Sequence, residues 1–337
     1  MTSTNDYLID IRNLNFNYQS SDDSQVNDSL ILNKVNLSIK NNEFVAVCGP
    51  SGSGKSTLFY VLGGLMRKYN GEVLFSGNEL KNFDEEQLAS FRNKNIGFIF
   101  QSFYLLPKLT VLENILLPIT YSASDKTDYE NRAKGYLQEF GLLDKMNTLP
   151  GKLSGGQQQR VAIIRSLINE PDIILADEPT GNLDSKNSKQ IMSLLKSIHK
   201  KGKTILIITH DLEVANECEK VIFLKDGQID KITINEINQV PKEKISKFNL
   251  KIERTPIRYF YSFKLAIKNL GYQKMRTFIN MLGIIIGIAA VFSMVTLGIY
   301  SKERILESYA SLGVNTIGFN GYPNWEMRAT DKSSRVF

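Results

Sequence analysis

The chain has 337 residues, 42% of them hydrophobic, which is enough for a packed core and excludes a disordered protein. Its formal net charge is +6, and the lysines are scattered except for a concentration after residue 240, so a membrane surface is favoured over nucleic acid as a partner. The two cysteines, Cys48 and Cys218, lie outside any metal-ligand spacing, and we expect free, buried thiols in a reducing compartment. The N-terminal segment has no basic stretch followed by an apolar one, so no secretion signal is visible.

Alternating segments predict two strands at the start of the chain, LIDIRNLNF and LILNKVNLSI, separated by the polar loop QSSDDSQVNDS. FVAVC at 44–48 is typical of a strand buried on both faces. It is followed by GPSGSGKST at 49–57, and we expect a helix from about Lys55 to Met66. This loop fits G-x-x-x-x-G-K-[ST], whose glycines let backbone N–H groups point at phosphate oxygens at a helix N-terminus. A chance glycine-rich turn is the alternative.

The loop pattern assigns roles to its polar side chains. Lys55 is expected to bridge the β- and γ-phosphates of a nucleotide, and the Ser56 hydroxyl to ligate Mg²⁺. The remaining phosphate-binding positions of the pattern are Gly49, Ser51, Gly52, Ser53, Gly54 and Thr57.

Three more strands are predicted, GFIFQ at 97–101, DIILAD at 172–177 and TILIIT at 204–209. Helices are expected around 131–140 and from LSGGQQQR to about residue 169, and this alternation predicts an α/β fold with a mainly parallel sheet. ILADE at 174–178 ends its strand in two carboxylates. Asp177 is expected to hold Mg²⁺ through water, and Glu178 to act as general base on the attacking water. Ordinary surface acids at a strand end are the alternative.

LSGGQQQR at 153–160 places a second glycine pair at the start of a second helix, which makes a second anion site. One nucleotide does not need two such sites from one chain. Here the sequence resembles the ATP-binding cassette (ABC) ATPases, whose signature is LSGGQ. The resemblance implies a head-to-tail homodimer in which Ser154, Gly155, Gly156 and Gln157 contact the γ-phosphate bound by the partner chain. An ordinary helix cap by Ser154 is the structural alternative.

The same resemblance assigns further positions. It implies that Tyr18 stacks on adenine, although packing is the usual role of such a tyrosine, and that Gln101 at a strand end contacts Mg²⁺ and water. It also implies that His210 grips the γ-phosphate and orders the catalytic water, and that residues 181–184 (GNLD) form the loop through which the two sites communicate. The other histidine, His199, lies in a lysine-flanked helix end, and we expect it to be solvated.

The C-terminal part differs from the ATP-binding domain predicted for 1–230. We expect a polar linker at 231–256, an amphipathic interfacial helix at 257–274, a membrane-spanning helix at 277–301 and the start of an extracytoplasmic domain at 302–337. A helix of about 25 residues is roughly 37 Å long, which exceeds the roughly 30 Å hydrocarbon core. The Lys/Arg excess before the span places that side in the cytoplasm. Ordinary packed helices are the alternative for both helices.

A cassette followed by a membrane span resembles the MacB family of macrolide exporters. The resemblance lies in GFIFQSFYLLPKLTVLEN at 97–114, ADEPTGNLDS at 176–185, KMRTFINMLGIIIGIAAV at 274–291 and LGVNTIGF at 312–319. It implies an inner-membrane ATPase that drives efflux of drugs, peptides or lipoproteins by mechanotransmission, with a periplasmic adaptor and an outer-membrane duct as partners. In that family a large external domain and three more spans follow the first span, whereas this sequence ends at Phe337.

Two other classes of ABC protein are alternatives to an exporter. An ABC ATPase that powers a non-transport membrane machine, regulating cell-wall enzymes, would use the same ATP chemistry. A soluble ABC protein acting on DNA or ribosomes is disfavoured, because such proteins usually carry a second cassette or a long coiled-coil insertion. We expect no nucleic-acid partner.

Overall fold

The computed structural model describes residues 7–18, 30–121, 126–235 and 274–311. The chain divides into two compact units, Met1–Phe263 and Lys264–Phe337. The predicted loop at 19–29, most of the predicted linker, nearly all of the predicted amphipathic helix and the LGVNTIGF segment lie outside the described residues.

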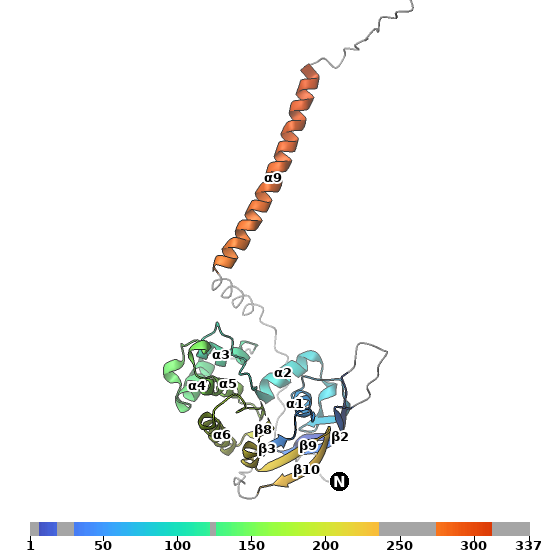
Figure 1. The fold of residues 1–337 in the computed structure, drawn as a ribbon, viewed down its shortest axis with the longest axis vertical. Helices are drawn as coiled ribbons and strands as arrows, with labels where there is room; N and C mark the ends of the chain where they lie inside the picture. The colour runs from blue at the N-terminus through green and yellow to red at the C-terminus, as the bar shows by residue number, and fades with distance from the viewer. Residues whose placement is uncertain (1–6, 19–29, 122–125, 236–273, 312–337) are drawn as a thin grey trace, which may run out of the picture. The chain divides into compact units, whose positions relative to one another are not determined.

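The first unit contains two sheets (Figure 1). The antiparallel sheet has the order β2-β1-β4-β5 and consists of β1 (Tyr7–Phe16), β2 (Leu32–Lys40), β4 (Asn70–Phe75) and β5 (Asn78–Glu79). The second sheet has the order β10-β9-β3-β8-β7-β6 and consists of β3 (Phe44–Cys48), β6 (Ile96–Ile99), β7 (Ile173–Asp177), β8 (Thr204–Thr209), β9 (Lys220–Lys225) and β10 (Gln228–Ile234). Its neighbouring strands are parallel except for the β9–β10 pair, which confirms the mainly parallel sheet.

The helices of this unit are α1 (Lys55–Leu62), α2 (Glu85–Asn95), α3 (Val111–Ile115), α4 (Lys126–Glu139), α5 (Gly155–Leu167), α6 (Ser185–Lys200) and α7 (Leu212–Asn216). Short 3₁₀ turns lie at Leu80–Asn82, Leu117–Tyr121, Leu143–Lys145 and Pro150–Lys152. The helix predicted to reach Met66 ends earlier, because Gly63 caps α1 and Gly64 is left-handed with φ +63°. The strand predicted at 97–101 ends at Ile99, so Gln101 lies in the turn after β6.

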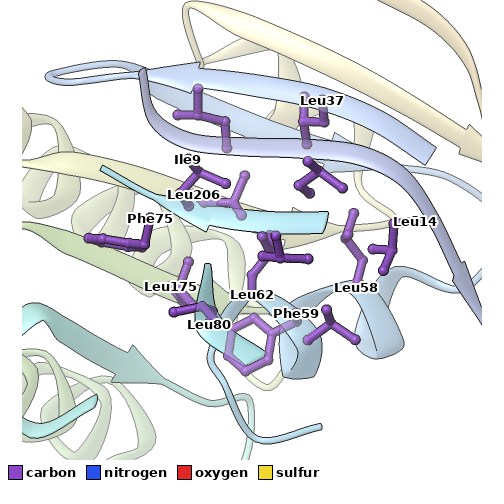
Figure 2. Packing of buried hydrophobic residues seen from close by; sticks show 14 of the residues in the cluster. Ile9, Leu14, Leu37, Leu58, Phe59, Leu62, Phe75, Leu80, Leu175 and Leu206 are labelled. Carbon is purple, nitrogen blue, oxygen red and sulfur yellow. The ribbon is translucent and has the colours of Figure 1, made fainter. Parts of the chain in front are cut away.

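The central strands β3, β7 and β8 of the six-stranded sheet are buried on both faces, because they alternate their side chains between two apolar clusters. In β3, Val45 and Val47 join the cluster beneath the antiparallel sheet, whereas Ala46 and Cys48 join the cluster with the helices of the other face. Helix α1 fills the space between the two sheets, as Figure 2 shows for Leu58, Phe59 and Leu62. The second cluster contains side chains from α3, α4, α5 and α6. The start of α1 is therefore held at one edge of a rigid sheet.

His199 is buried, so the expectation of a solvated side chain was wrong. It is 2% exposed, its Nε2 lies 3.2 Å from Glu219 Oε1, and its Nδ1 lies 3.0 Å from the carbonyl oxygen of Lys203. Its ring also stacks on Phe44 with 5.4 Å between centroids. Both cysteines are free and buried, as predicted.

The second unit contains one described helix, α9 (Lys274–Ser311), which runs past the end predicted at residue 301. An 18-residue window within its segment Phe278–Ser311 has a mean hydropathy of 2.5, and the segment is long and apolar enough to cross a membrane. At the end of the described part of the first unit, β10 continues to Ile234, which pairs with Lys220 of β9. The sheet thus extends past residue 230, the predicted end of the cassette.

Candidate functional site

Three polar segments meet at one edge of the parallel sheet. β3 pairs with β8 in parallel register up to Cys48 and Thr209, and β7 pairs with β8 up to Asp177. β3 continues into the glycine-rich loop. β7 ends in Asp177, which Glu178 follows, and β8 continues into His210. The crevice at the carboxyl ends of parallel strands is where α/β folds bind ligands. The topology therefore brings together three groups of residues singled out in the sequence.

The glycine-rich loop is fitted tightly against the sheet. A Cβ at Gly49 would lie 2.1 Å from the carbonyl oxygen of Leu224 in β9, so only glycine fits there without a shift. Gly52 has φ +81°, and Gly54, the N-cap of α1, has φ +96°. The first turn of α1 leaves backbone N–H groups without intrahelical partners, and these groups favour an anion.

Lys55 is folded onto the loop that precedes it. Its Nζ donates to the carbonyl oxygens of Gly49 at 2.9 Å and Pro50 at 2.7 Å, and the residue is 8% exposed. Ser53 Oγ is buried and has no hydrogen-bond partner among the residues that the structure describes. Ser51 and Ser56 are exposed, and Thr57 is buried. The loop thus offers a cation, a hydroxyl without a partner and a helix N-terminus, which together fit a phosphate chain.

Glu178 and His210 form the tightest polar contact at this edge. Glu178 Oε1 accepts from His210 Nδ1 at 2.6 Å and from the backbone N–H of His210 at 3.1 Å, and Oε2 accepts from Thr209 Oγ1 at 3.4 Å. Because a carboxylate only accepts, we assign the imidazole proton to Nδ1. The Glu178 side chain is 15% exposed, whereas that of His210 is 68% exposed. The pair presents a fixed carboxylate and an accessible imidazole.

Asp177 is a partly buried carboxylate next to Glu178 and within reach of the charge of Lys55. Burial raises its pKa, the charge of Glu178 raises it further, and the ammonium of Lys55 opposes both. A half-buried carboxylate that feels the lysine of the loop is suited to a divalent cation, because the cation supplies the missing positive charge. Asp177 and the Ser56 hydroxyl offer the oxygen ligands that Mg²⁺ prefers.

Gln101 lies against the turn that follows Glu178. A Cβ at Gly181 would lie 2.9 Å from Gln101 Nε2, and Asn182 Nδ2 donates to the carbonyl oxygen of Gln101 at 3.0 Å. Gln101 is therefore an immediate neighbour of this acidic turn, although it lies in the turn that follows β6.

The segment after Gln101 is held by an arginine that sequence reasoning missed. Phe103 and Tyr104 are left-handed, with φ +49° and +47°. Arg165 of α5 donates to their carbonyl oxygens at 2.6 and 2.7 Å, and burial lowers its pKa to about 10. The sequence signal was an arginine among the apolar positions of a helix, but its carbonyl partners lie about sixty residues away.

The LSGGQ residues form a capped helix start. Ser154 Oγ accepts from the backbone N–H of Gln157 at 3.3 Å, and Gln157 Oε1 accepts from the backbone N–H of Ser154 at 2.9 Å. Gly155 is partly buried, and a Cβ at its position would reach only ordinary contact with Leu183, at 3.5 Å. In the described part of the chain no hydrogen bond joins residues 154–157 to the 49–57 loop.

The loop at 181–184 touches this helix start through Asn187, a second residue that sequence reasoning missed. A Cβ at Gly156 would lie 2.4 Å from Asn187 Oδ1. Asp184, the N-cap of α6, accepts from the backbone N–H of Asn187 at 2.8 Å and from its Nδ2 at 2.7 Å. The residues predicted to serve the partner's nucleotide are thus in contact with the predicted communication loop.

Tyr18 ends the described part of the N-terminal strand region. It is 54% exposed, its ring meets Phe16 edge-on at 5.1 Å, and its hydroxyl lies 3.9 Å from Met66 Sδ. One ring face is therefore available for stacking, although no contact places this residue beside Lys55.

The chain was compared with known families, sequences and structures. The family described as ABC transporter matches residues 32–181. The macrolide export ATP-binding/permease protein MacB of Pasteurella multocida is 40% identical over 325 residues, which are 95% of this chain and 50% of that protein. MacB of Shewanella sp. (strain W3-18-1) is 43% identical over 291 residues, 85% of this chain and 45% of that protein. The chain thus spans about half the length of these relatives.

Two solved structures cover the cassette itself. The dimeric structure of MJ0796, a bacterial ABC transporter cassette, is 42% identical with a TM-score of 0.61, and the match covers 67% of this chain and 98% of that chain. A dimeric post-hydrolysis state of the same cassette bound to ADP and Pi is 41% identical with the same TM-score and coverage.

Proposed function

Because this chain belongs to the ABC transporter family of ATP-hydrolysing cassettes, we propose that it is the ATPase part of a MacB-like exporter. The observation that carries the proposal is the Glu178–His210 contact of 2.6 Å at the same sheet edge as the phosphate loop. A carboxylate held there by two donors of one histidine suits water activation next to a bound phosphate chain.

The residues around the loop would hold the nucleotide and its metal ion. Lys55 and the N–H groups at the start of α1 bind the phosphates of ATP, with Gly49, Gly52 and Gly54 shaping the backbone. Ser56, Asp177 and Gln101 would hold Mg²⁺, which would neutralise phosphate charge when bound. The partial burial of Asp177 beside Glu178 and Lys55 supports this assignment.

Hydrolysis depends on groups of the chain itself. Glu178 accepts a proton from the attacking water, and the hydrogen bonds from Thr209 and His210 fix the direction of its carboxylate. General-base catalysis contributes about 10²–10⁴-fold in rate. When both ring nitrogens of His210 carry a proton, the exposed Nε2–H donates to the γ-phosphate and helps to order the water.

The signature residues serve a second copy of the chain. The helix start at Ser154, Gly155, Gly156 and Gln157 has no hydrogen bond to the 49–57 loop of its own chain within the described residues, which supports completion of the site by a partner. The dimeric cassettes at 41–42% identity support a homodimer. Tyr18 stacks on the adenine of the nucleotide bound by its own chain.

The second unit anchors the ATPase in a membrane. Helix α9 spans the inner membrane, and the Lys/Arg excess before it supports a cytoplasmic position of the cassette. Opening and closing of the dimer drives efflux of drugs, peptides or lipoproteins by mechanotransmission through this anchor. A periplasmic adaptor and an outer-membrane duct are the partners that the MacB resemblance implies.

Glu178→Gln tests the proposal. Glutamine keeps an acceptor oxygen for the His210 donors but is far too weak a base, so we expect turnover to fall by roughly 10²–10⁴-fold while ATP still binds. Phosphate release and binding of a fluorescent ATP analogue report the two properties. Glu139→Gln, which removes a surface carboxylate paired with Lys201, is the control and should leave both unchanged. Turnover of Glu178→Gln at the wild-type rate would refute Glu178 as the base.

A further inference from the structure

Gln159 in α5 is a buried glutamine whose only side-chain hydrogen bond among the described residues leads to the turn that follows Glu178. It is 0% exposed, and its Nε2 donates to the carbonyl oxygen of Pro179 at 2.7 Å. Its Oε1 is buried without a partner in the described part of the chain. The amide orientation follows from the contact, because a carbonyl oxygen accepts and only the NH₂ group can donate to it.

Pro179 directly follows Glu178, so this hydrogen bond holds the backbone that carries the carboxylate. Glu178 has φ +47°, a left-handed conformation that a glutamate rarely adopts and that its surroundings must enforce. Three further bonds define the turn: Glu178 N–H to Ile208 O at 2.8 Å, Gly181 N–H to Glu178 O at 3.1 Å, and the His210 contact at 2.6 Å. Within the described residues, Gln159 supplies the side-chain hydrogen bond that joins this turn to α5, the signature helix that begins with the LSGGQ residues.

Packing alone does not explain a glutamine at this position. A buried amide with an unpaired oxygen is unfavourable, and an apolar side chain of the same length would avoid that penalty. The bond to Pro179 is what the glutamine adds. Gln159 also lies on the same rigid helix as Ser154, roughly 7 Å further along its axis. It therefore connects the LSGGQ helix start to the turn that aims Glu178 in the same chain.

We infer that Gln159 is a positioning residue for ATP hydrolysis: its bond to Pro179 fixes the Glu178 turn to the signature helix. The inference rests on the proposed function, because it assumes that Glu178 activates the water. In the dimer, one chain's LSGGQ residues bind the partner's ATP while its Glu178 acts on its own ATP. Gln159 links these two roles within one chain.

Gln159→Met removes the donor and the unpaired oxygen while keeping an unbranched chain of similar length. We expect kcat for ATP hydrolysis by the full chain in detergent to fall by tenfold or more, with the KM for ATP changed by less than about threefold, because the phosphate loop is not touched. The control is Gln158→Met in the same helix, whose Nε2 donates to Leu153 O and not to the turn. It should leave both constants near their wild-type values.

A second measurement does not depend on turnover. Hydrogen exchange of the backbone N–H groups of Glu178, Thr180 and Gly181 should accelerate tenfold or more in Gln159→Met, with β7 and the Gln158→Met control unchanged. Unchanged exchange at this turn overturns the inference, whether or not the chain hydrolyses ATP. Unchanged kcat in a wild-type-active chain also overturns it. An inactive wild-type chain, or an active Glu178→Gln variant, counts instead against the proposed function.

Discussion

Replacing Gly49 with alanine measures how closely the phosphate loop is built against the sheet. The new Cβ would lie 2.1 Å from Leu224 O and 2.9 Å from Ser53 Oγ. Leu224 belongs to β9, which pairs with β3 on one side and β10 on the other, so its oxygen cannot withdraw without parting strands. A carbon–oxygen contact needs about 3.3 Å, so backbone must move by roughly 1 Å. Overpacking of this severity should cost about 3 kcal/mol.

Gly52→Ala is the matched variant in the same loop. No atom lies within 4 Å of its would-be Cβ, so only the backbone conformation at φ +81° resists the change. That conformation costs alanine about 1 kcal/mol. The difference of about 2 kcal/mol should place the melting temperature of Gly49→Ala roughly 4–8 °C below that of Gly52→Ala. Calorimetry of the cassette transition measures both. Equal melting temperatures, or the reverse order, would refute the steric reasoning.

Three further perturbations concern charge, burial and stacking. Asp177→Asn should raise the melting temperature at pH 7, because the raised pKa means that folding penalises the ionised acid. The gain should vanish below about pH 4, where the carboxyl is protonated in both states. His199→Ala should destabilise the cassette by about 3 kcal/mol in urea titrations, since Glu219 loses a buried partner at 3.2 Å; a loss below 1 kcal/mol would contradict this. Tyr18→Ala should weaken ATP binding about fivefold or more, as measured by fluorescence, while Tyr18→Phe binds normally because the ring supplies the stacking. Equal affinities of the two variants would exclude stacking.

The sequence was most informative where chemistry needs residues that are close together along the chain. The GPSGSGKST motif consists of nine consecutive residues. The structure has the predicted strand before it and a helix after it. Asp177 and His210 could be placed at one edge because parallel strands order their carboxyl ends. The positions of these strands needed only local pattern and topology, whereas the role of His210 was implied by the family resemblance.

Tertiary contacts supplied what local patterns could not. His199 was judged by its lysine neighbours, although Ile191, Leu195 and Ile198 recur at helical spacing and place position 199 on the buried face of α6. Gln159 was missed because its partner Pro179 belongs to another segment, and Asn187 was missed because its neighbour Gly156 does. A glutamine in LSGGQQQR has no local sign that it donates to a carbonyl twenty residues further along the chain.

The hydrogen bonds of Lys55 to its own loop have a consequence for the rate at which a nucleotide associates. Its Nζ already donates to the carbonyl oxygens of Gly49 and Pro50, so the ammonium has two protein partners before a nucleotide binds. An arriving phosphate therefore exchanges one set of acceptors for another, and no loop has to fold around it. Little ordering entropy is lost in such an exchange. We expect the association rate of nucleotide to rise linearly with its concentration, without a plateau set by a preceding conformational step.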